Sequence, residues 1–378
     1  MSRRHICYVT GTRADFGLMR STLLRVHATP NLSLSLVATG MHLDPGFGHT
    51  VDEVEAAGPP VVAKIPLPEG PSSGATMARH IGIMTTGFVD SFIAADPDIV
   101  LLLGDRGEML AAAIAAIHLN IHIAHIAGGD RSGTIDEPIR HAISKLSHFH
   151  LTSTEQSRDR LIRMGENPDH IHVVGTPSLD DILDTRVAPR EEVLRPFGLD
   201  PDRPFALVVF HPVVQDALDA GRQCQEILVA LEGADLQAIA LMPNSDAGSD
   251  AIQGVLNVAS GRAGFSVQTH LPRPAFLQVL AHADVMVGNS SSGIVEAASF
   301  GTPVVNVGPR QSSRERNANV VDVPCLASDI LAGLQRGLGA GRASAPNVYG
   351  DGRSGERICR FLESVDLDPA VLKKLNAY

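Results

Sequence analysis

Short apolar runs alternate with helical patterns of hydrophobic residues along the first half of the chain. The run Ile99–Leu103 contains no polar residue, which is typical of a strand in a parallel sheet covered on both faces. The pattern predicts further strands at 6–9, 32–38, 121–126 and 150–153, and helices at 16–27, 109–117 and from Thr134 onward. Strands that alternate with helices form βαβ units, so we expect a parallel sheet here.

The same alternation restarts after a polar, proline-bearing stretch at 178–204, which we interpret as a domain linker. Strands are predicted at 206–210, 238–242, 285–287 and 304–307, and a helix at 294–300. Two such halves predict an α/β protein of two Rossmann-like domains whose parallel sheets face a central cleft. We expect an N-terminal domain at 1–180, a C-terminal domain at 181–355, and a C-terminal helix at 356–378 that packs back on the N-terminal domain.

Polar chemistry gathers at the predicted strand exits. Ligands of open parallel sheets bind beyond the carboxyl ends of the strands. Nearly every such turn combines glycine with a charged residue, a histidine or a hydroxyl, at 11–15, 40–42, 104–106, 128–130, 211–212, 243–244 and 289–293. This placement predicts a ligand in the cleft.

Three serines, Ser290 to Ser292, follow a strand and open a helix. Their hydroxyls and free N–H groups at the positive helix end could form a cradle for a phosphate, although N-capping by one serine is the simpler alternative. Glu296, one turn further, could accept a ribose hydroxyl. A second candidate cradle lies at 11–13, where Arg13 could reach a phosphate or could simply be a surface arginine.

Several acids are candidates for proton transfer. Asp105 and Asp130 directly follow strands, whereas Asp136 and Glu137 lie at a helix start, where acids are favoured for structural reasons alone. Carboxylates in a closed cleft can shift one another's pKa and divide acid and base work. His211, directly after a strand, is a further site candidate.

No metal or dinucleotide cofactor is expected. His122 and His125 lie three apart in a predicted strand, so their side chains should point to opposite faces, and no cysteine joins them or His118. None of the predicted strands is followed by the G-x-G-x-x-G pattern of tightly bound NAD.

Composition narrows the class of protein. The 378 residues, 44% of them hydrophobic, can bury two cores, and the net charge of −11 argues against nucleic acid as a partner. Four cysteines lie far apart without a C-x-x-C pair, which indicates reduced thiols in a cytoplasmic protein. No apolar run approaches the length of a membrane span, so no membrane partner is expected.

The turn sequences form an ordered set from about residue 5 to about residue 325. They read Thr-Gly-Thr-Arg-Ala-Asp at 10–15, Thr-Gly-Met-His at 39–42, Leu-Gly-Asp-Arg at 103–106, His-Ile-Ala-Gly-Gly-Asp at 125–130, Ile-Asp-Glu-Pro-Ile-Arg-His at 135–141, Phe-His-Pro at 210–212, Asp-Ala-Gly-Ser-Asp at 246–250 and Gly-Asn-Ser-Ser-Ser-Gly at 288–293. As a set they resemble the hydrolysing UDP-N-acetylglucosamine 2-epimerases, including the UDP-N,N'-diacetylbacillosamine 2-epimerase branch.

The resemblance implies a GT-B-like fold, with UDP in the cleft, and an elimination–hydration reaction. Anti elimination of UDP gives a glycal, water adds at C1, and C2 is reprotonated on the opposite face. UDP-N-acetylglucosamine would give N-acetylmannosamine and UDP for sialic or nonulosonic acid synthesis, and the alternative substrate is UDP-N,N'-diacetylbacillosamine of legionaminic acid synthesis. A non-hydrolysing epimerase, a glycosyltransferase and a UDP-sugar-binding regulator remain alternatives. A homo-oligomer, a dimer or tetramer, is also expected.

Carried over by position, the resemblance assigns two groups of residues. Those expected to hold UDP are Arg13, Asp15, Arg106, His211, Asn244, Ser290, Ser291, Ser292, Gly293, Glu296 and Arg310. Those expected to serve the reaction are Asp105, Asp130, Asp136, Glu137 and His42, without deciding which acid is the base.

The chain departs from the family pattern where the sugar should lie. The usual His-Ile-His-Gly-Gly-Glu has Ala127 in place of the second histidine and Asp130 in place of the glutamate, whose reach is about 1.5 Å longer. The following segment, 131–134, is one residue shorter. These changes leave the exact sugar open.

Overall fold

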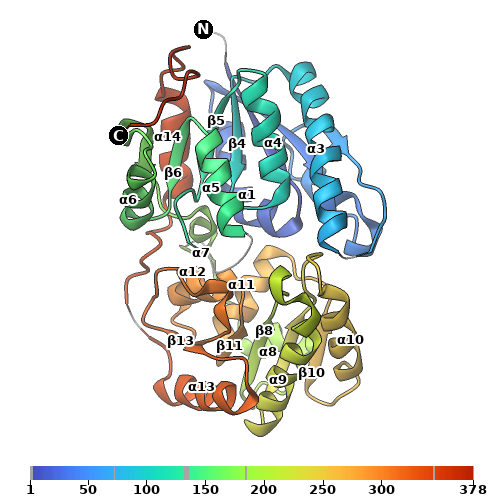
Figure 1. The fold of residues 1–378 in the computed structure, drawn as a ribbon. Helices are drawn as coiled ribbons and strands as arrows, with labels where there is room; N and C mark the ends of the chain where they lie inside the picture. The colour runs from blue at the N-terminus through green and yellow to red at the C-terminus, as the bar shows by residue number, and fades with distance from the viewer. Residues whose placement is uncertain (1–2, 72, 132–135, 184, 344, 378) are drawn as a thin grey trace.

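The computed structural model describes residues 3–71, 73–131, 136–183, 185–343 and 345–377. Its two α/β lobes lie one above the other, with helix α14 at the end of the chain returning to the first lobe (Figure 1). The first sheet has seven strands in the order β3-β2-β1-β4-β5-β6-β7, and the second has six in the order β10-β9-β8-β11-β12-β13. All strand pairs are parallel. The prediction of two parallel-sheet α/β domains is therefore confirmed.

The first domain is built from β1 (Arg4–Thr10), α1 (Arg13–Ala28), β2 (Leu32–Thr39), α2 (Val51–Ala56), β3 (Val61–Ile65), α3 (Gly74–Ala95), β4 (Ile99–Leu103), α4 (Gly107–His118), β5 (His122–Ile126), α5 (Asp136–Leu146), β6 (Phe149–Thr152), α6 (Glu155–Arg163) and β7 (Ile171–Val173), and α14 (Ser354–Ser364) packs on it. The second domain is built from β8 (Phe205–Val209), α9 (Ala220–Gly233), β9 (Gln237–Leu241), α10 (Ser249–Ala259), β10 (Phe265–Gln268), α11 (Arg273–His282), β11 (Val285–Gly288), α12 (Ser291–Val295), β12 (Val304–Val307), β13 (Val320–Val323) and α13 (Ala327–Ala340).

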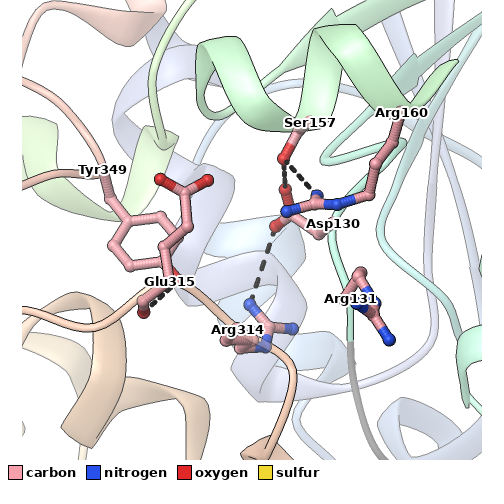
Figure 2. A pocket seen from close by; sticks show the side chains of 7 residues that line it. All are labelled: Asp130, Arg131, Ser157, Arg160, Arg314, Glu315 and Tyr349. Atoms are coloured by element: carbon pink, nitrogen blue, oxygen red, sulfur yellow. Dashed lines mark hydrogen bonds and ion pairs between the residues drawn. The ribbon is translucent and has the colours of Figure 1, made fainter.

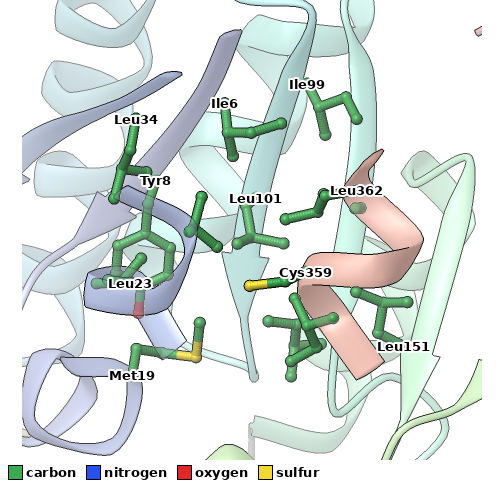
Figure 3. Packing of buried hydrophobic residues seen from close by; sticks show 14 of the residues in the cluster. Ile6, Tyr8, Met19, Leu23, Leu34, Ile99, Leu101, Leu151, Cys359 and Leu362 are labelled. Carbon is green, nitrogen blue, oxygen red and sulfur yellow. The ribbon is translucent and has the colours of Figure 1, made fainter. Parts of the chain in front are cut away.

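Both faces of the first sheet are buried, as the apolar strands predict. Along β1, Ile6 and Tyr8 face a core shared with α1 and α14, whereas Cys7 and Val9 face a core shared with α3 and α4. Figure 3 shows Leu362 of α14 packed into the first of these cores. Alternating side chains thus serve two helix layers, which is why the strand reads as continuously apolar.

Three local predictions need correction. The helix expected at 356–378 is α14, which begins at Ser354 and ends at Ser364. The stretch at 178–204 is partly helical, since it contains α7 (Asp180–Leu183) and α8 (Arg190–Leu194). The predicted helix at 294–300 is two short pieces, because α12 ends at Val295 and a 3-10 turn, Ala297–Phe300, follows. Thr134, expected to begin a helix, lies outside the described residues. Among the residues that are described, no helix has the length and apolar character needed to cross a membrane.

Candidate active site between the two domains

The strand order places the expected site residues at two facing positions. In each sheet the order reverses between a first strand and its neighbour, at β1 and β4 in one domain and at β8 and β11 in the other, and such reversals open a crevice for ligands. Three ion pairs connect the two domains between segments that follow the strands of each sheet. They are Arg106 Nη2 with Asp246 Oδ1 at 3.3 Å, Arg310 Nη2 with Asp136 Oδ2 at 3.8 Å, and Arg314 Nη1 with Asp130 Oδ2 at 3.6 Å. The structure therefore brings together predicted residues that lie far apart in the chain.

One buried arginine joins the two acidic turns of the first domain. Arg140 on α5 is 1% exposed. Its Nη2 forms an ion pair with Asp105 Oδ2, and its Nη1 donates to the backbone oxygen of Asp130 at 3.0 Å. Sequence reasoning did not single out Arg140 as a site residue, although it belongs to the recognised motif at 135–141. The arginine fixes the ends of β4 and β5 relative to α5.

Asp130 lies in a small pocket where the two domains meet (Figure 2). Its carboxylate accepts from Ser157 Oγ at 2.7 Å and Ser153 Oγ at 3.4 Å, and Arg314 approaches from the second domain. Burial raises the pKa of Asp130, while the charge of Arg314 and the bond from Ser157 act against this rise. The pocket is lined by Asp130, Arg131, Ser157, Arg160, Arg314, Glu315 and Tyr349.

A second contact closes the same pocket. Thr154 Oγ1 donates to the Glu315 carboxylate, and Tyr349 donates its hydroxyl to the Glu315 backbone oxygen at 2.9 Å. Glu315 and Tyr349 come from segments that the sequence analysis did not connect with the site. Asp130 is thus held by the serines of its own domain and pairs with Arg314 of the other.

Asp136 and Glu137 form the described start of α5 and are partly exposed. Glu137 Oε1 lies 3.5 Å from Arg131 Nε and 3.5 Å from His141 Nε2. Residues 132–134, which belong to the shortened segment after Asp130, lie outside the described residues. Both acids can therefore serve a ligand or simply the helix start.

The loop after β1 is organised by Asp15. Thr12 caps α1, and the Asp15 carboxylate accepts from the N–H groups of Gly11 at 3.0 Å and Thr12 at 2.8 Å, which an anion in this loop would need. Burial raises the pKa of Asp15 to about 6. Arg13 pairs with Glu53, and its Nε donates at 2.8 Å. In this structure the Asp15 carboxylate therefore shapes the loop, and its expected contact with UDP stays a prediction.

His42 lies behind this loop and is 0% exposed. Its Nε2 is 2.9 Å from Thr10 Oγ1 and its Nδ1 is 2.7 Å from Thr50 Oγ1. Burial, followed by the charge of Arg13, lowers the pKa of His42 to about 4. Both ring nitrogens are engaged by threonine hydroxyls in this structure, and the expected role of His42 in the reaction stays a prediction.

His211, Asn289 and Arg310 form one unit on the second domain. The Asn289 side chain accepts from His211 N and donates to His211 O, both at 2.8 Å, and Asn289 O accepts from Arg310 Nη1 at 3.1 Å. Asn244 N donates to His211 Nδ1 at 3.2 Å, so the proton of the neutral ring is on Nε2. Burial and the charge of Arg310 lower the pKa of His211 to about 3. The unit presents one cation and one neutral donor.

The serine turn caps α12 and has further hydrogen-bonding groups for a ligand. Ser290 caps α12 by accepting from Ser292 N at 3.3 Å, and their hydroxyl oxygens lie 2.8 Å apart. A Cβ at Gly293 would lie 2.9 Å from Val304 Cγ1, so this glycine serves packing. Ser291, the first residue of α12, is partly exposed. Ordinary capping thus explains Ser290 but leaves Ser291 available to a phosphate.

Glu296, expected at the ribose, is 2% exposed and lies 2.6 Å from Arg273 Nη1 through its Oε1. Burial raises the pKa of Glu296, and Arg273 acts against this rise. Among the described residues, no group of three or more histidines, cysteines and acids is arranged to hold a metal ion.

The sequence of this chain is similar to those of known sugar-nucleotide epimerases. The UDP-N-acetylglucosamine 2-epimerase family model matches residues 24–363. A Legionella pneumophila protein named UDP-N,N'-diacetylbacillosamine 2-epimerase (hydrolyzing) is 48% identical, covering 99% of this chain and all of the relative. A UDP-N-acetylglucosamine 2-epimerase of Neisseria meningitidis is 35% identical, covering 96% of this chain and 95% of that one.

The fold has a close structural counterpart. The Methanocaldococcus jannaschii UDP-GlcNAc 2-epimerase, crystallised with UDP-GlcNAc and UDP, superposes with a TM-score of 0.81 at 20% identity, covering 95% of this chain and 99% of that one. Together with the family match, this likeness confirms the resemblance seen in the turn sequences. The chain belongs to the UDP-N-acetylglucosamine 2-epimerase family.

Proposed function

We propose that this chain is a hydrolysing 2-epimerase, which converts a UDP-2-acetamido sugar into the free 2-epimeric sugar and UDP. The observation that carries the proposal is the 48% identity, over essentially the whole of both chains, to the L. pneumophila protein named for this activity. The site geometry supports it, because acids of the first domain face arginines of the second.

In this proposal UDP binds mainly to the second domain and also contacts Arg106 of the first. Arg310 and Arg106 carry the positive charge that a diphosphate needs, and each is now paired with an acid, Asp136 and Asp246 respectively. Ser291, the partly exposed first residue of α12, adds a hydroxyl and a backbone N–H. A diphosphate would replace those acids as the partner of the arginines.

The reaction needs a base, a stabilised leaving group and a second proton source. The base removes the proton from C2 while the C1–O bond to UDP breaks, and the freed electron pair forms the C1=C2 double bond. Water then adds its oxygen to C1, and an acid delivers a proton to C2 on the opposite face. We assign Asp105 and Asp130 to these two proton transfers. The raised pKa of Asp130 suits a carboxyl that carries a proton for part of the cycle.

Within this class we propose UDP-N,N'-diacetylbacillosamine as the preferred substrate, for the synthesis of a legionaminic-type acid. UDP-GlcNAc is the second candidate, and the 35% identity to the N. meningitidis enzyme favours it. The two substrates are tested by incubating the full chain with each and following UDP release by chromatography. A higher kcat/KM for the diacetylated sugar is expected.

The possible outcomes separate the alternatives. UDP release from UDP-GlcNAc alone would replace the first substrate by the second. Epimerisation with UDP still attached would identify a non-hydrolysing enzyme, and no turnover of either sugar would overturn the activity.

We also infer a cytoplasmic homo-oligomer, a dimer or tetramer. The four cysteines are all free, as expected in a reducing compartment. Analytical ultracentrifugation tests the assembly, and a single species with the mass of one chain would contradict it.

A further inference from the structure

His125 links the two turns that carry the proposed proton-transfer acids. It lies on β5, is 0% exposed, and belongs to the motif that ends in Asp130. Its Nε2 lies 2.7 Å from the backbone oxygen of Gly104, directly before Asp105, and its Nδ1 lies 3.1 Å from Ser144 Oγ on α5. The ring therefore spans from the end of β4 to the helix that carries Arg140.

The hydrogen-bond partners fix the tautomer of this histidine. A backbone oxygen can only accept, so Nε2 carries the proton and donates to Gly104 O. The unprotonated Nδ1 then accepts from the Ser144 hydroxyl. Burial lowers the pKa of His125 to about 3, so the ring stays neutral and keeps this arrangement near neutral pH.

The surroundings leave Gly104 little freedom. Its N–H donates to Ile126 O at 3.0 Å, so β5 holds both backbone polar groups of Gly104, one directly and one through His125. Its φ of +79° is a conformation that glycine adopts readily. A Cβ at Gly128 would lie 3.0 Å from both His125 Nδ1 and Ser144 Oγ, so the backbone packs closely over this hydrogen bond.

These contacts close a ring around the acid. Asp105 pairs with Arg140 of α5, Ser144 lies one turn further along the same helix, and His125 returns from Ser144 to Gly104. The Asp105 carboxylate is thus held by the arginine, and the backbone directly before Asp105 is held by the histidine. Neither contact alone would set both the position and the direction of the Asp105 side chain.

We propose that His125 is a positioning residue, which sets the Asp105 carboxylate for proton transfer at C2. The inference rests on the proposed function. A misplacement of about 1 Å at a reacting group can lower the rate about 10²-fold, so a contact of this kind should act on kcat rather than on binding.

Two substitutions separate the roles of the ring nitrogens. In His125→Gln, the longer side chain can place an amide N–H near the position of Nε2 and keep the bond to Gly104 O. In His125→Asn, the shorter side chain reaches only the position of Nδ1. We expect His125→Asn to lower kcat by about 10-fold to 10²-fold with KM and UDP affinity nearly unchanged, and His125→Gln to retain most of kcat.

Wild-type activity in the same assay keeps the two proposals apart. No UDP release by the wild type from either sugar rejects the proposed function, whereas wild-type kcat in a folded His125→Asn rejects the positioning role. Should His125→Asn fail to fold, His125→Gln decides. Equal losses of UDP affinity and kcat in His125→Gln would overturn the inference.

Discussion

Replacing Asp105 by asparagine removes one charge from the site and changes the shape of the side chain very little. Two effects are expected, one on chemistry and one on stability. A positioned acid or base contributes about 10²-fold or more to kcat, which corresponds to about 2.7 kcal/mol of activation free energy. The affinity for UDP should be largely kept, because Asp105 has no part in the proposed diphosphate site.

The stability effect arises from the partner of Asp105. Arg140 is 1% exposed and would lose its ion pair, and removing one member of a buried pair costs about 3–5 kcal/mol. The Asp105 side chain is 21% exposed, and asparagine can still accept through its Oδ1, so we expect about 2 kcal/mol. The variant should therefore unfold at lower denaturant concentration and yet remain folded in the assay.

A matched control separates the two effects. Asp284, directly before β11, pairs with Arg190 at 2.8 Å and accepts from Phe205 N at 2.8 Å. It lies at the amino-terminal end of the strand, and the site lies at the carboxyl ends of the strands. Asp284→Asn should lower the free energy of unfolding and leave kcat near the wild-type value. Urea unfolding gives the stabilities, and UDP release gives kcat. Wild-type kcat in Asp105→Asn, or equal losses of kcat in both variants, would refute the assignment of Asp105.

Three further results follow from the proposed reaction and one from a buried carboxylate. Saturating UDP should raise the melting temperature, because a hundredfold excess over Kd adds about 2.7 kcal/mol to the free energy of unfolding. Ser291→Phe should weaken this effect in a folded protein. An unchanged melting temperature of the wild type with UDP would reject the phosphate cradle. Turnover in D₂O should place one deuterium at C2 of the released sugar, as mass spectrometry or NMR would detect, and a product with only hydrogen there excludes the elimination. Activity should survive EDTA, because arginines supply the charge that neutralises the diphosphate, and a loss restored by Mg²⁺ or Mn²⁺ would contradict this. Burial alone would raise the pKa of Glu166, but hydrogen bonds from His150, Lys145 and Lys374 lower this pKa from 4.5 to about 2. Glu166 therefore contributes stability above about pH 4.5, and this contribution is lost as the pH falls toward 2. Urea unfolding of Glu166→Gln should therefore show lower stability at neutral pH and a flatter decline in acid, and an unchanged acid profile would count against this cluster.

The sequence predicts the interior strands better than the edges of the sheets. Nine of the observed strands were expected, and the four that were not, β3, β7, β10 and β13, are the outermost strands of the two sheets. An edge strand is covered less completely, so polar residues enter its pattern, as Lys64 does in β3 and Asp322 in β13. Hydrophobic patterning measures burial, and burial fades at an edge.

The expected site residues show a similar limit. Turns after strands were recognised because their chemistry is local, and the structure brings Asp130, Asp136 and Arg310 to the domain interface. Arg314 and Arg140 were not singled out, since each lies in a segment whose local pattern is that of an ordinary loop or helix. Their importance depends on which groups face them after folding. For the same reason the sequence does not show the hydrogen bonds that Asp15 and His42 form within the first domain, and their expected roles stay predictions.

The charges at the domain interface also show how the site can remain ready for a diphosphate. Arg310 and Arg106 are paired with Asp136 and Asp246 at 3.8 and 3.3 Å, which is longer than a well-formed charge-assisted hydrogen bond. An entering diphosphate offers shorter charge-assisted hydrogen bonds to both arginines, so it can compete with the two acids for them. Asp136 then loses Arg310 as a partner at the start of α5, on the same helix as Arg140, which holds Asp105. Binding of the leaving group would therefore change the charge around the proton-transfer acids at the moment when the substrate is in place, and this links UDP recognition by one domain to the chemistry of the other.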